Sequence, residues 1–375
     1  MYPFDSNKLD RLMEEAGLDL LLASTRHNVR YLTGGYYYHF HANATRMGQT
    51  QYLPFVGVLR GRMGDAFFVC RAEERGQVEA AAPWISSRVE AMRGTLPAAD
   101  GAVKAISKRG LTSGTIGVEL PFLPADAFLA LQRGLPNARL VDATPVLDEL
   151  RAIKTPAELA HLRSVYDRVA EAIQAAFAAG RPGITTAEIA RCTEREITRR
   201  EMGFLYALVS AGPGTLRAPS SARWERGRIL HIDAGGEVGD YLADICRMGC
   251  LGEPPALAKD LHAACIDIQG RVRHRVRPGV PCRELLVEGE RAVRENRFAP
   301  CGKFVAHGIG MVSHEQPIVS PTNTRPLEAG MVLSIETDFI YPEVGHVKIE
   351  DAVAVTEDGC EGLGDLGRDW HVVPV

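Results

Sequence analysis

The sequence predicts an α/β domain followed by an α+β domain that is built from two similar halves. Strand-like and helix-like segments alternate up to about residue 150, as is typical of an α/β domain. After that point, two helix-like segments followed by strand-like segments occur twice. Carboxylates and histidines end several of the later strands, so we expect the chemistry where the two halves of the second domain meet.

The first domain is expected to span residues 1–152. Helical spacing from Leu9 leads into an apolar run at residues 18–23, which indicates a helix followed by a strand. Further elements follow in the order that an α/β domain requires. Strand-like runs lie at 55–59, 66–69 and 115–119, and a helical stretch lies at 125–133.

An aromatic and histidine cluster at residues 36–41 follows two glycines and fits neither a plain strand nor a plain helix. Two interpretations stay open. The cluster is either a half-buried loop whose rings serve packing, or a loop that faces the substrate. In the second case the substrate contacts are Tyr36, Tyr37, Tyr38 and His39.

The second domain is expected to span residues 153–375 and to begin with a capped helix. Thr155 can cap this helix, and Pro156 suits its first turn. The spacing of Thr185 and Glu188 predicts a capping box for the next helix. The expected helices span about 156–179, 186–202, 255–276 and 283–294.

Four carboxylates and one histidine are the candidate metal ligands. Three of the carboxylates end strand-like apolar runs, where ionised side chains are costly without a cation. Four converging carboxylates would repel one another, whereas two divalent ions neutralise them and leave the imidazole to complete the coordination. The candidates are Asp233, Asp244, His307, Glu336 and Glu350.

The donor set therefore predicts two divalent metal ions per chain. Oxygen ligation with a single histidine suits catalytic manganese, cobalt, iron or zinc better than a structural zinc site. We favour manganese, with cobalt, zinc or iron as alternatives. The eight cysteines include no C-x-x-C pair, so most are expected to be reduced core residues and none is expected among these ligands.

The composition argues against several classes of protein. A chain of 375 residues that is 46% hydrophobic and 24% charged is expected to fold around a sizeable core. Its formal net charge of −4 argues against a nucleic-acid partner. The chain starts without a signal-like segment and has no run of about 18 apolar residues, so we expect a cytoplasmic protein without membrane contact.

Several motifs resemble one family. Asp233 and Asp244 have ten residues between them. Three motifs follow in order, namely His-Gly-Ile-Gly from His307, His-Glu from His314 and Lys-Ile-Glu-Asp from Lys348. Together they resemble the pita-bread metallopeptidases, which include prolidase, aminopeptidase P and methionine aminopeptidase, with creatinase as a metal-free relative.

The resemblance extends to the first domain. Asn-x-x-Tyr-Leu-Thr-Gly from Asn28, and Leu-Arg-x-Ile-Lys-x-Pro-x-Glu from Leu150, resemble the creatinase-type N-terminal domain and its junction. The resemblance thus covers nearly the whole chain. It implies an α+β pita-bread catalytic domain preceded by a smaller α/β creatinase-type domain.

The resemblance also implies roles for the site residues. A hydroxide that bridges the two ions would be the nucleophile. Glu336 would take the proton from the attacking water, and His314 would steady the tetrahedral oxyanion. In this family the N-terminal domain of a neighbouring subunit often covers the site, which implies a homodimer. The implied ligand roles are Asp233 on one metal, His307 and Glu336 on the other, and Asp244 and Glu350 as bridges.

Two positions depart from the family's pattern. A family histidine upstream of the first aspartate, expected to bond the substrate near the scissile amide, aligns here with Leu216. Another family histidine, four residues before the ligand histidine, is replaced by Lys303. Both changes remove hydrogen-bonding groups, so we expect altered substrate recognition.

Two further residues are unusual for the family. His231 lies two residues before Asp233, so on a strand both side chains point to the same face. His231 is either a core histidine satisfied by a neighbour, or a substrate contact or extra ligand. Cys246 lies two residues after Asp244 and is either a small packed residue or a thiol near the metal that would favour softer ions.

The expected function is a dinuclear metal-dependent hydrolase of a peptide or amide C–N bond, either an Xaa-Pro aminopeptidase or an Xaa-Pro dipeptidase. The preserved ligand set supports it. The alternative is a metal-dependent hydrolase or lyase of a small non-peptide metabolite, similar to ectoine hydrolase or dimethylsulfoniopropionate lyase. Leu216, Lys303 and the cluster at 36–41 favour that alternative. A binding protein without activity would be expected to have lost ligands, and the expected partner is a short peptide or small molecule.

Overall fold

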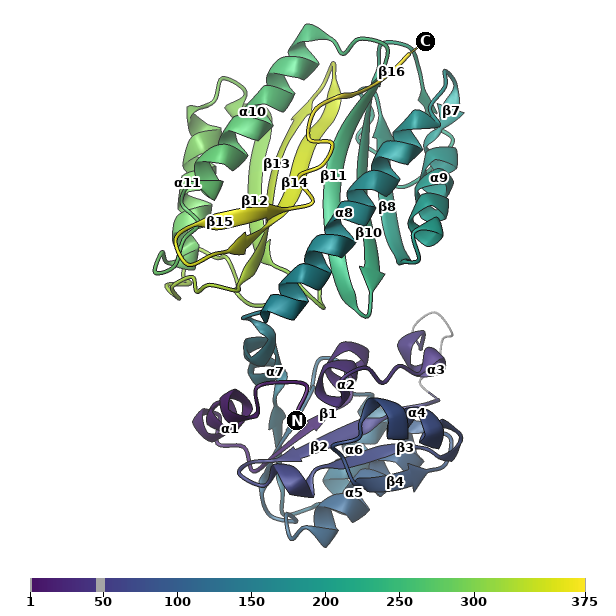
Figure 1. Cartoon of the computed structure of the whole chain (residues 1–375), viewed down its shortest axis with the longest axis vertical. Helices are drawn as coiled ribbons and strands as arrows, with labels where there is room; N and C mark the ends of the chain where they lie inside the picture. The colour runs from purple at the N-terminus through teal and green to yellow at the C-terminus, as the bar shows by residue number, and fades with distance from the viewer. Residues whose placement is uncertain (1, 45–50, 375) are drawn as a thin grey trace. The chain divides into compact units, whose positions relative to one another are not determined.

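The computed structural model describes residues 2–44 and 51–374. The chain divides into two compact units, Met1–Leu150 and Arg151–Val375 (Figure 1). The boundary expected from the sequence lies two residues later, between 152 and 153. No helix in the described ranges is both long enough and apolar enough to cross a bilayer.

The N-terminal unit is built on a six-stranded sheet with the order β4-β3-β2-β1-β5-β6. Strand β1 is apolar on both faces, because Leu20 and Leu22 belong to one apolar core and Leu21 and Ala23 to the other. The strands are β1 Leu20–Ala23, β2 Phe55–Leu59, β3 Phe67–Arg71, β4 Ser87–Ala91, β5 Thr115–Val118 and β6 Arg139–Asp142. The helices are α1 Ser6–Glu15, α2 Arg26–Thr33, α3 His39–Ala42, η1 Met63–Asp65, η2 Ala72–Glu74, α4 Arg75–Ala81, α5 Thr95–Lys108, α6 Ala125–Gly134 and α7 Thr144–Arg151.

The aromatic cluster at residues 36–41 differs from the expected loop. Helix α3 begins at His39, and this single turn is too short for an apolar period to reveal it. Tyr36 is 2% exposed, and its ring packs edge-on against Phe68 with 4.9 Å between centroids. The ring of Tyr36 thus packs in the core of the N-terminal unit, which favours the packing interpretation, and its contact with substrate stays a prediction.

The C-terminal unit is built on an eight-stranded sheet with the path β12-β13-β14-β11-β10-β8, while β15 pairs with β14 and β16 with β11. A small second sheet joins β7 and β9. The strands are β7 Ile184–Thr185, β8 Gly203–Ala211, β9 Arg223–Trp224, β10 Ile229–Val238, β11 Tyr241–Leu251, β12 Gly302–Gly308, β13 Val332–Tyr341, β14 Gly345–Val355, β15 Cys360–Leu363 and β16 His371–Val373. The helices are α8 Pro156–Ala178, α9 Thr186–Arg199, α10 Ala256–Arg273, α11 Cys282–Glu295 and η3 Ala299–Cys301.

The expected helix starts in this unit are confirmed. Thr155 and Thr185 each form a capping box with the glutamate three residues later, and Pro156 occupies the first turn of α8. Helix α9 ends three residues before the expected position, at Arg199. The capping side chains therefore define where these helices begin more sharply than apolar spacing defines where they end.

Helices α8 and α10 lie across the same face of the large sheet (Figure 1). Alternate strand residues point to these helices: Ile232 of β10 packs in the core around α8, and Ile335 and Ile349 pack in the core around α10. The residues between them, including the candidate ligands, point to the opposite face. The alternation of side chains along each strand thus gives the sheet two different faces. One is the packing face beneath the helices, and the other, which we call the chemical face, carries the candidate ligands.

The two halves of the unit meet where β11 pairs with β14. In the part of the chain that the structure describes, the ladder between these strands is the single residue pair Cys246–Glu350. On either side, β10 pairs with β11 over ten residue pairs and β13 pairs with β14 over ten. The seam between the halves is therefore short, and it runs through the candidate metal ligands.

Candidate metal centre

A continuous row of facing residues crosses four strands at the seam. Asp233 on β10 faces Cys246 on β11, Cys246 faces Glu350 on β14, and Glu350 faces Glu336 on β13. Asp244 lies two residues before Cys246 on β11, so its side chain points to the same face. Four carboxylates thus converge without any sequence proximity between the halves.

His307 joins this row from the next strand. It lies on β12 opposite Ser334, which is two residues before Glu336 on β13. Ligand atoms of His307, Glu336 and Glu350 lie within 4.8 Å of one another, and so do those of Asp233, Asp244 and Glu350. The structure therefore brings all five candidate ligands into two groups that share Glu350.

Lys348 provides a positive charge within this cluster. Its Nζ lies 2.6 Å from Glu350, 2.8 Å from Glu336 and 2.9 Å from Asp233. Burial opposes its charge, but the three carboxylates raise the pKa of the ammonium well above its usual range. Lys348 lies two residues before Glu350 on the same strand, so its position could have been predicted from the alternation of side chains.

The carboxylates of the centre differ in their pKa values. Burial, together with the charge of Asp233, raises the pKa of Asp244 to about 7. Burial and Asp244 also raise the pKa of Glu350. Burial alone would raise the pKa of Glu336 as well, but His307 and Lys348 outweigh it and hold that pKa at about 2. A single ammonium is therefore not enough to keep all four carboxylates ionised.

The donor set fits divalent cations. Asp244 Oδ1 is buried and has no hydrogen-bond partner among the described residues, which is costly unless a cation or water meets it. Four carboxylates and one imidazole match the ligands that catalytic manganese, iron, cobalt or zinc ions use. Glu350 would be shared, since it belongs to both groups.

Two histidines stack at the edge of the cluster. His307 Nε2 lies 3.2 Å from Glu336 Oε1, and the rings of His307 and His314 stack with 3.9 Å between centroids. Burial would lower the pKa of His307, but Glu336 and Glu350 outweigh it and raise that pKa. Burial and His307 lower the pKa of His314, so His314 is neutral near pH 7. Its side chain is exposed.

A buried ion cluster anchors the turn that carries His314. Glu315 is 1% exposed, and its carboxylate lies 2.9 Å from Lys154 Nζ and 3.3 Å from Arg151. Its backbone also bridges to Gly308, the residue after His307. The position of His314 is thus tied to the start of the C-terminal unit.

Two family profiles cover most of the chain. Residues 160–357 match metallopeptidase family M24, and residues 6–153 match the creatinase/prolidase N-terminal domain. The chain belongs to metallopeptidase family M24. The expected pita-bread domain with a creatinase-type domain before it is therefore confirmed.

Named relatives agree with this family. The chain is 25% identical to a putative dipeptidase, YkvY, of Bacillus subtilis, over 98% of this chain and 100% of that one. It is 27% identical to an Xaa-Pro dipeptidase of Pyrococcus furiosus, over 60% of this chain and 66% of that one. The fold is similar to the crystal structure of an X-Pro aminopeptidase from Thermotoga maritima, with a TM-score of 0.80, 22% identity and coverage of 98% and 99%.

Three residues that sequence reasoning missed approach the M24 centre. Ser334 Oγ donates to Glu350 Oε1 at 2.9 Å, and Arg217 Nη1 lies 3.5 Å from Asp233 Oδ2. Tyr206 on β8 faces Gly235, where an added Cβ would lie 2.6 Å from its ring. Burial and Asp244 raise the pKa of Tyr206, so its phenol stays protonated as a donor.

The two positions that depart from the family pattern lie at the surface, whereas the two further residues that are unusual for the family are buried. Leu216 is 59% exposed, next to Arg217, and Lys303 is exposed on β12. His231 is fully buried and stacks on His346, with 4.4 Å between centroids. Cys246 is fully buried within the ligand row.

The remaining predicted substrate contacts belong to the N-terminal unit. Tyr37 is half-buried beneath the Arg30 guanidinium, which lies 5.1 Å from the ring centroid. Tyr38 packs edge-on against Tyr52 with 4.9 Å between centroids, and His39 is exposed. Their contact with substrate stays a prediction.

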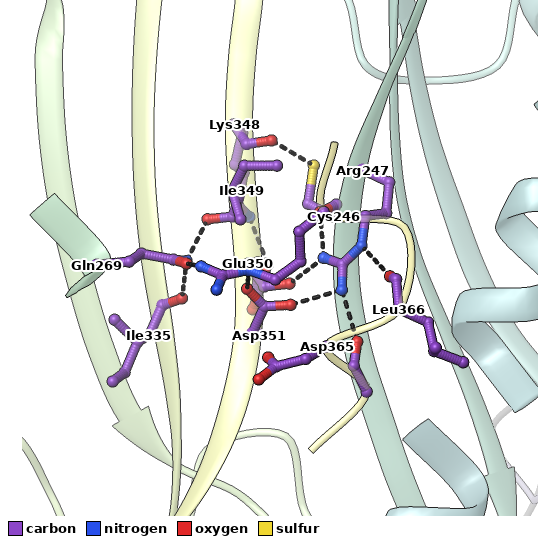
Figure 2. Close-up of polar contacts among 12 residues, drawn as sticks. Cys246, Arg247, Gln269, Ile335, Lys348, Ile349, Glu350, Asp351, Asp365 and Leu366 are labelled. Carbon is purple, nitrogen blue, oxygen red and sulfur yellow. Dashed lines mark hydrogen bonds and ion pairs between the residues drawn. The ribbon is translucent and has the colours of Figure 1, made fainter. Parts of the chain in front are cut away.

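The back of the M24 centre is held by Arg247, whose side chain points to the helix-covered face of the sheet (Figure 2). Its guanidinium donates to the carbonyl oxygens of Cys246 at 2.9 Å and Glu350 at 3.0 Å, the two residues of the seam. It also pairs with Asp351 at 2.6 Å and donates to Leu366 O at 2.8 Å. One buried cation thus ties the backbones of both halves directly behind the ligands.

Gln269 of α10 supports the second half in a similar way (Figure 2). Its Nε2 donates to Ile335 O at 2.7 Å and to Ile349 O at 2.9 Å. These residues immediately precede Glu336 and Glu350 in the chain. The backbone that carries both glutamates is therefore fixed from behind by one amide.

Proposed function

We propose that this protein hydrolyses Xaa-Pro peptide bonds, as an aminopeptidase or a dipeptidase. The convergence of all five candidate ligands into two groups that share Glu350 carries the proposal. The printed activities of the Pyrococcus and Thermotoga proteins support the choice of substrate class. These comparisons do not favour the alternative of a small non-peptide metabolite.

We propose further that two divalent cations bind per chain. Asp233, Asp244 and Glu350 would hold one ion, and His307 and Glu336 would hold the other together with Glu350. The oxygen-rich donor set favours manganese, with cobalt, zinc or iron as alternatives. When bound, such ions polarise the scissile carbonyl and lower the pKa of water toward neutrality.

The chain's own groups would handle the protons. Glu336 is ionised at neutral pH because His307 and Lys348 lower the pKa of its carboxyl to about 2, so it can accept a proton from the attacking water. His314 is neutral, and its Nδ1 lies 3.1 Å from Ser313 Oγ, which leaves Nε2 to face the developing oxyanion. Lys348 would keep Asp233, Glu336 and Glu350 in place in the metal-free protein.

We also propose a homodimer in which the N-terminal unit of one subunit covers the centre of the other. The exposed His39 and Phe40 of the aromatic cluster provide a surface for this contact. Light scattering of the purified protein tests the stoichiometry. Two chains per particle support the dimer, and a single chain at micromolar concentration contradicts it.

The test of function combines metal analysis with turnover. The full-length chain is loaded with manganese, cobalt, zinc or iron, and Xaa-Pro dipeptides and longer Xaa-Pro peptides are assayed with each. Release of proline from dipeptides alone identifies a dipeptidase, and release of the first residue from longer peptides identifies an aminopeptidase. A protein that binds two ions but cleaves neither class contradicts the proposal.

A further inference from the structure

A third group of possible ligands lies beside the two that the proposed function uses. His231, Asp233 and Cys246 each offer one ligand atom, and these atoms lie within 4.8 Å of one another. Cys246 faces Asp233 across the β10–β11 ladder, and His231 lies two residues before Asp233 on β10. All three side chains therefore point to the chemical face of the sheet.

His231 has no evident structural partner for its polar atoms. It is 0% exposed, and neither ring nitrogen has a hydrogen-bond partner among the described residues. A buried imidazole in this state costs free energy unless something binds it. Its ring stacks on His346 at an interplanar angle of 11°, and His346 Nε2 lies 2.9 Å from Asp338 Oδ2. The stack fixes the ring plane, so the lone pair of a ring nitrogen stays available in that plane.

Cys246 occupies the centre of the ligand row. It is 0% exposed and lies between Asp233 and Glu350 in the facing register. Among the described residues, its Sγ makes one weak hydrogen bond, to Lys348 O at 3.5 Å. A buried thiol beside carboxylates stays protonated by itself, whereas a coordinating cation would deprotonate it outright.

This group is separate from the position between Asp233 and Asp244. His231 and Asp244 lie on opposite sides of the facing pair Asp233–Cys246. Asp244 faces Gly235, four residues after His231 on β10, and four residues along a strand correspond to roughly 13 Å, which is too far for one ion to bind His231 and Asp244 together. The position toward His231 therefore needs a cation of its own.

We propose that His231, Asp233 and Cys246 form a third cation position that takes zinc or cobalt in preference to manganese. Nitrogen, oxygen and sulfur donors suit these softer ions, and a thiolate with a carboxylate balances two positive charges. The Lys348 ammonium lies 2.9 Å from Asp233, so like charge weakens this position relative to the pair. It fills last. The inference rests on the part of the proposed function in which Asp233 also binds one ion of the neighbouring pair. It does not depend on which substrate the protein cleaves.

Cobalt titration of the metal-free full-length protein tests the proposal without any substrate. Absorption in the near ultraviolet reports sulfur-to-cobalt charge transfer, and elemental analysis with native mass spectrometry reports the metal count. The first two equivalents should bind without a thiolate band. The third should produce the band and bring the count to three ions per chain.

Three variants assign the band to the proposed ligands. Cys246→Ser should lose the band and the third ion. His231→Phe, which keeps the stacked ring, should weaken the third equivalent by more than the roughly 10–100-fold that loss of an outer hydrogen-bond partner costs. Cys250→Ser is the matched control, because Cys250 is also fully buried on β11 but lies four residues further along. It should keep both the band and the third ion.

Three results would overturn the proposal. A thiolate band with the first or second equivalent would make Cys246 a ligand of the pair. A count of two ions without the band would leave the third position empty. If Cys246→Ser fails to fold by circular dichroism, an unchanged cobalt titration of His231→Phe would contradict the proposal by itself. Because no substrate is added, a failed peptidase assay would leave this result intact.

Discussion

At the scale of single residues, Lys348 acts as an internal counterion for the metal-free centre. Three carboxylates lie within 2.9 Å of its Nζ, and the side chain is almost fully buried. Divalent cations at the two ligand groups would replace much of its electrostatic role. The protein therefore has a charge that keeps the metal-free centre folded and that also opposes metal binding.

Lys348→Met removes this counterion. We expect the metal-free variant to lose about 3–5 kcal/mol of folding free energy, because buried carboxylates lose their charge partner. Saturating manganese should restore most of that loss. Urea unfolding with and without metal measures both effects, and Lys303→Met, on exposed Lys303 of β12, is the control. Equal losses in the metal-free and metal-loaded forms would contradict the counterion role.

Asp244→Ala and Glu350→Ala test two of the proposed ligands, of which Glu350 belongs to both groups. Each variant should lose bound metal and peptidase activity together, since each carboxylate would contact a cation in the proposed centre. Elemental analysis and turnover measure the two properties. Glu343→Ala, on an exposed glutamate between β13 and β14, should change neither. Two metals retained by either ligand variant would contradict its assignment.

At the scale of elements, the structure depends on how β11 is fixed to β14. Among the described residues, one facing pair joins these strands, and Arg247 adds hydrogen bonds to both carbonyl groups of that pair. A buried guanidinium therefore does at the seam what a ladder of backbone hydrogen bonds does elsewhere in the sheet. The geometry of the ligands in the two halves depends on that one side chain.

Arg247→Met should weaken the seam. We expect a loss of roughly 3–5 kcal/mol in unfolding free energy, because Asp351 loses a buried partner. Metal affinity should fall as well, since Glu350 shifts relative to Asp233. Arg273→Met is the comparison, because the Arg273 guanidinium contacts Asp351 and Asp365 but not the seam carbonyls. If both variants bind metal equally well, Arg247 has no positioning role.

Part of the site could be predicted from local pattern and part could not. Three of the ligands were found because a carboxylate ends an apolar run in the sequence, although the strands themselves continue beyond Asp233, Glu336 and Glu350. The helix starts were found because a threonine is followed three residues later by a glutamate. The single pair Cys246–Glu350 joins residues about a hundred positions apart, so no local pattern reveals it. Tyr206 could not be predicted from a local pattern either, because the register between β8 and β10 shifts between Gly235 and Gly236. Arg247 was not predicted as a site residue, because its side chain points to the helix-covered face of the sheet and binds backbone carbonyl groups there.

At the scale of the whole molecule, the two units respond to different conditions. The C-terminal unit carries the metal ligands, so cations that bind only the folded state stabilise it. The N-terminal unit contains a buried histidine, His41, whose Nδ1 lies 3.1 Å from Tyr52 O. Burial lowers the pKa of His41 to about 4, although this hydrogen bond opposes the shift.

The lowered pKa of His41 predicts acid sensitivity in the N-terminal unit. The unfolded chain binds a proton below about pH 6.5, while the folded unit does not until about pH 4. The contribution to stability is complete above pH 6.5 and falls by about 3 kcal/mol as the pH drops to 4. Hydrogen exchange of β2 at several pH values measures it. His41→Gln should flatten the dependence, whereas His39→Gln, on exposed His39, should not; equal profiles would contradict the prediction.

The short seam also has a consequence for the order of folding. Hairpins β10–β11 and β13–β14 close over short turns, whereas Cys246 and Glu350 must meet across a long loop, which is slow. Pulsed hydrogen exchange during refolding should therefore show the hairpin amides protected before those at the seam. Simultaneous protection would contradict this order. A chain still being synthesised would then lack a complete cation site until β14, which carries Glu350, has been made and has paired with β11, so cations could occupy the whole site only after that step.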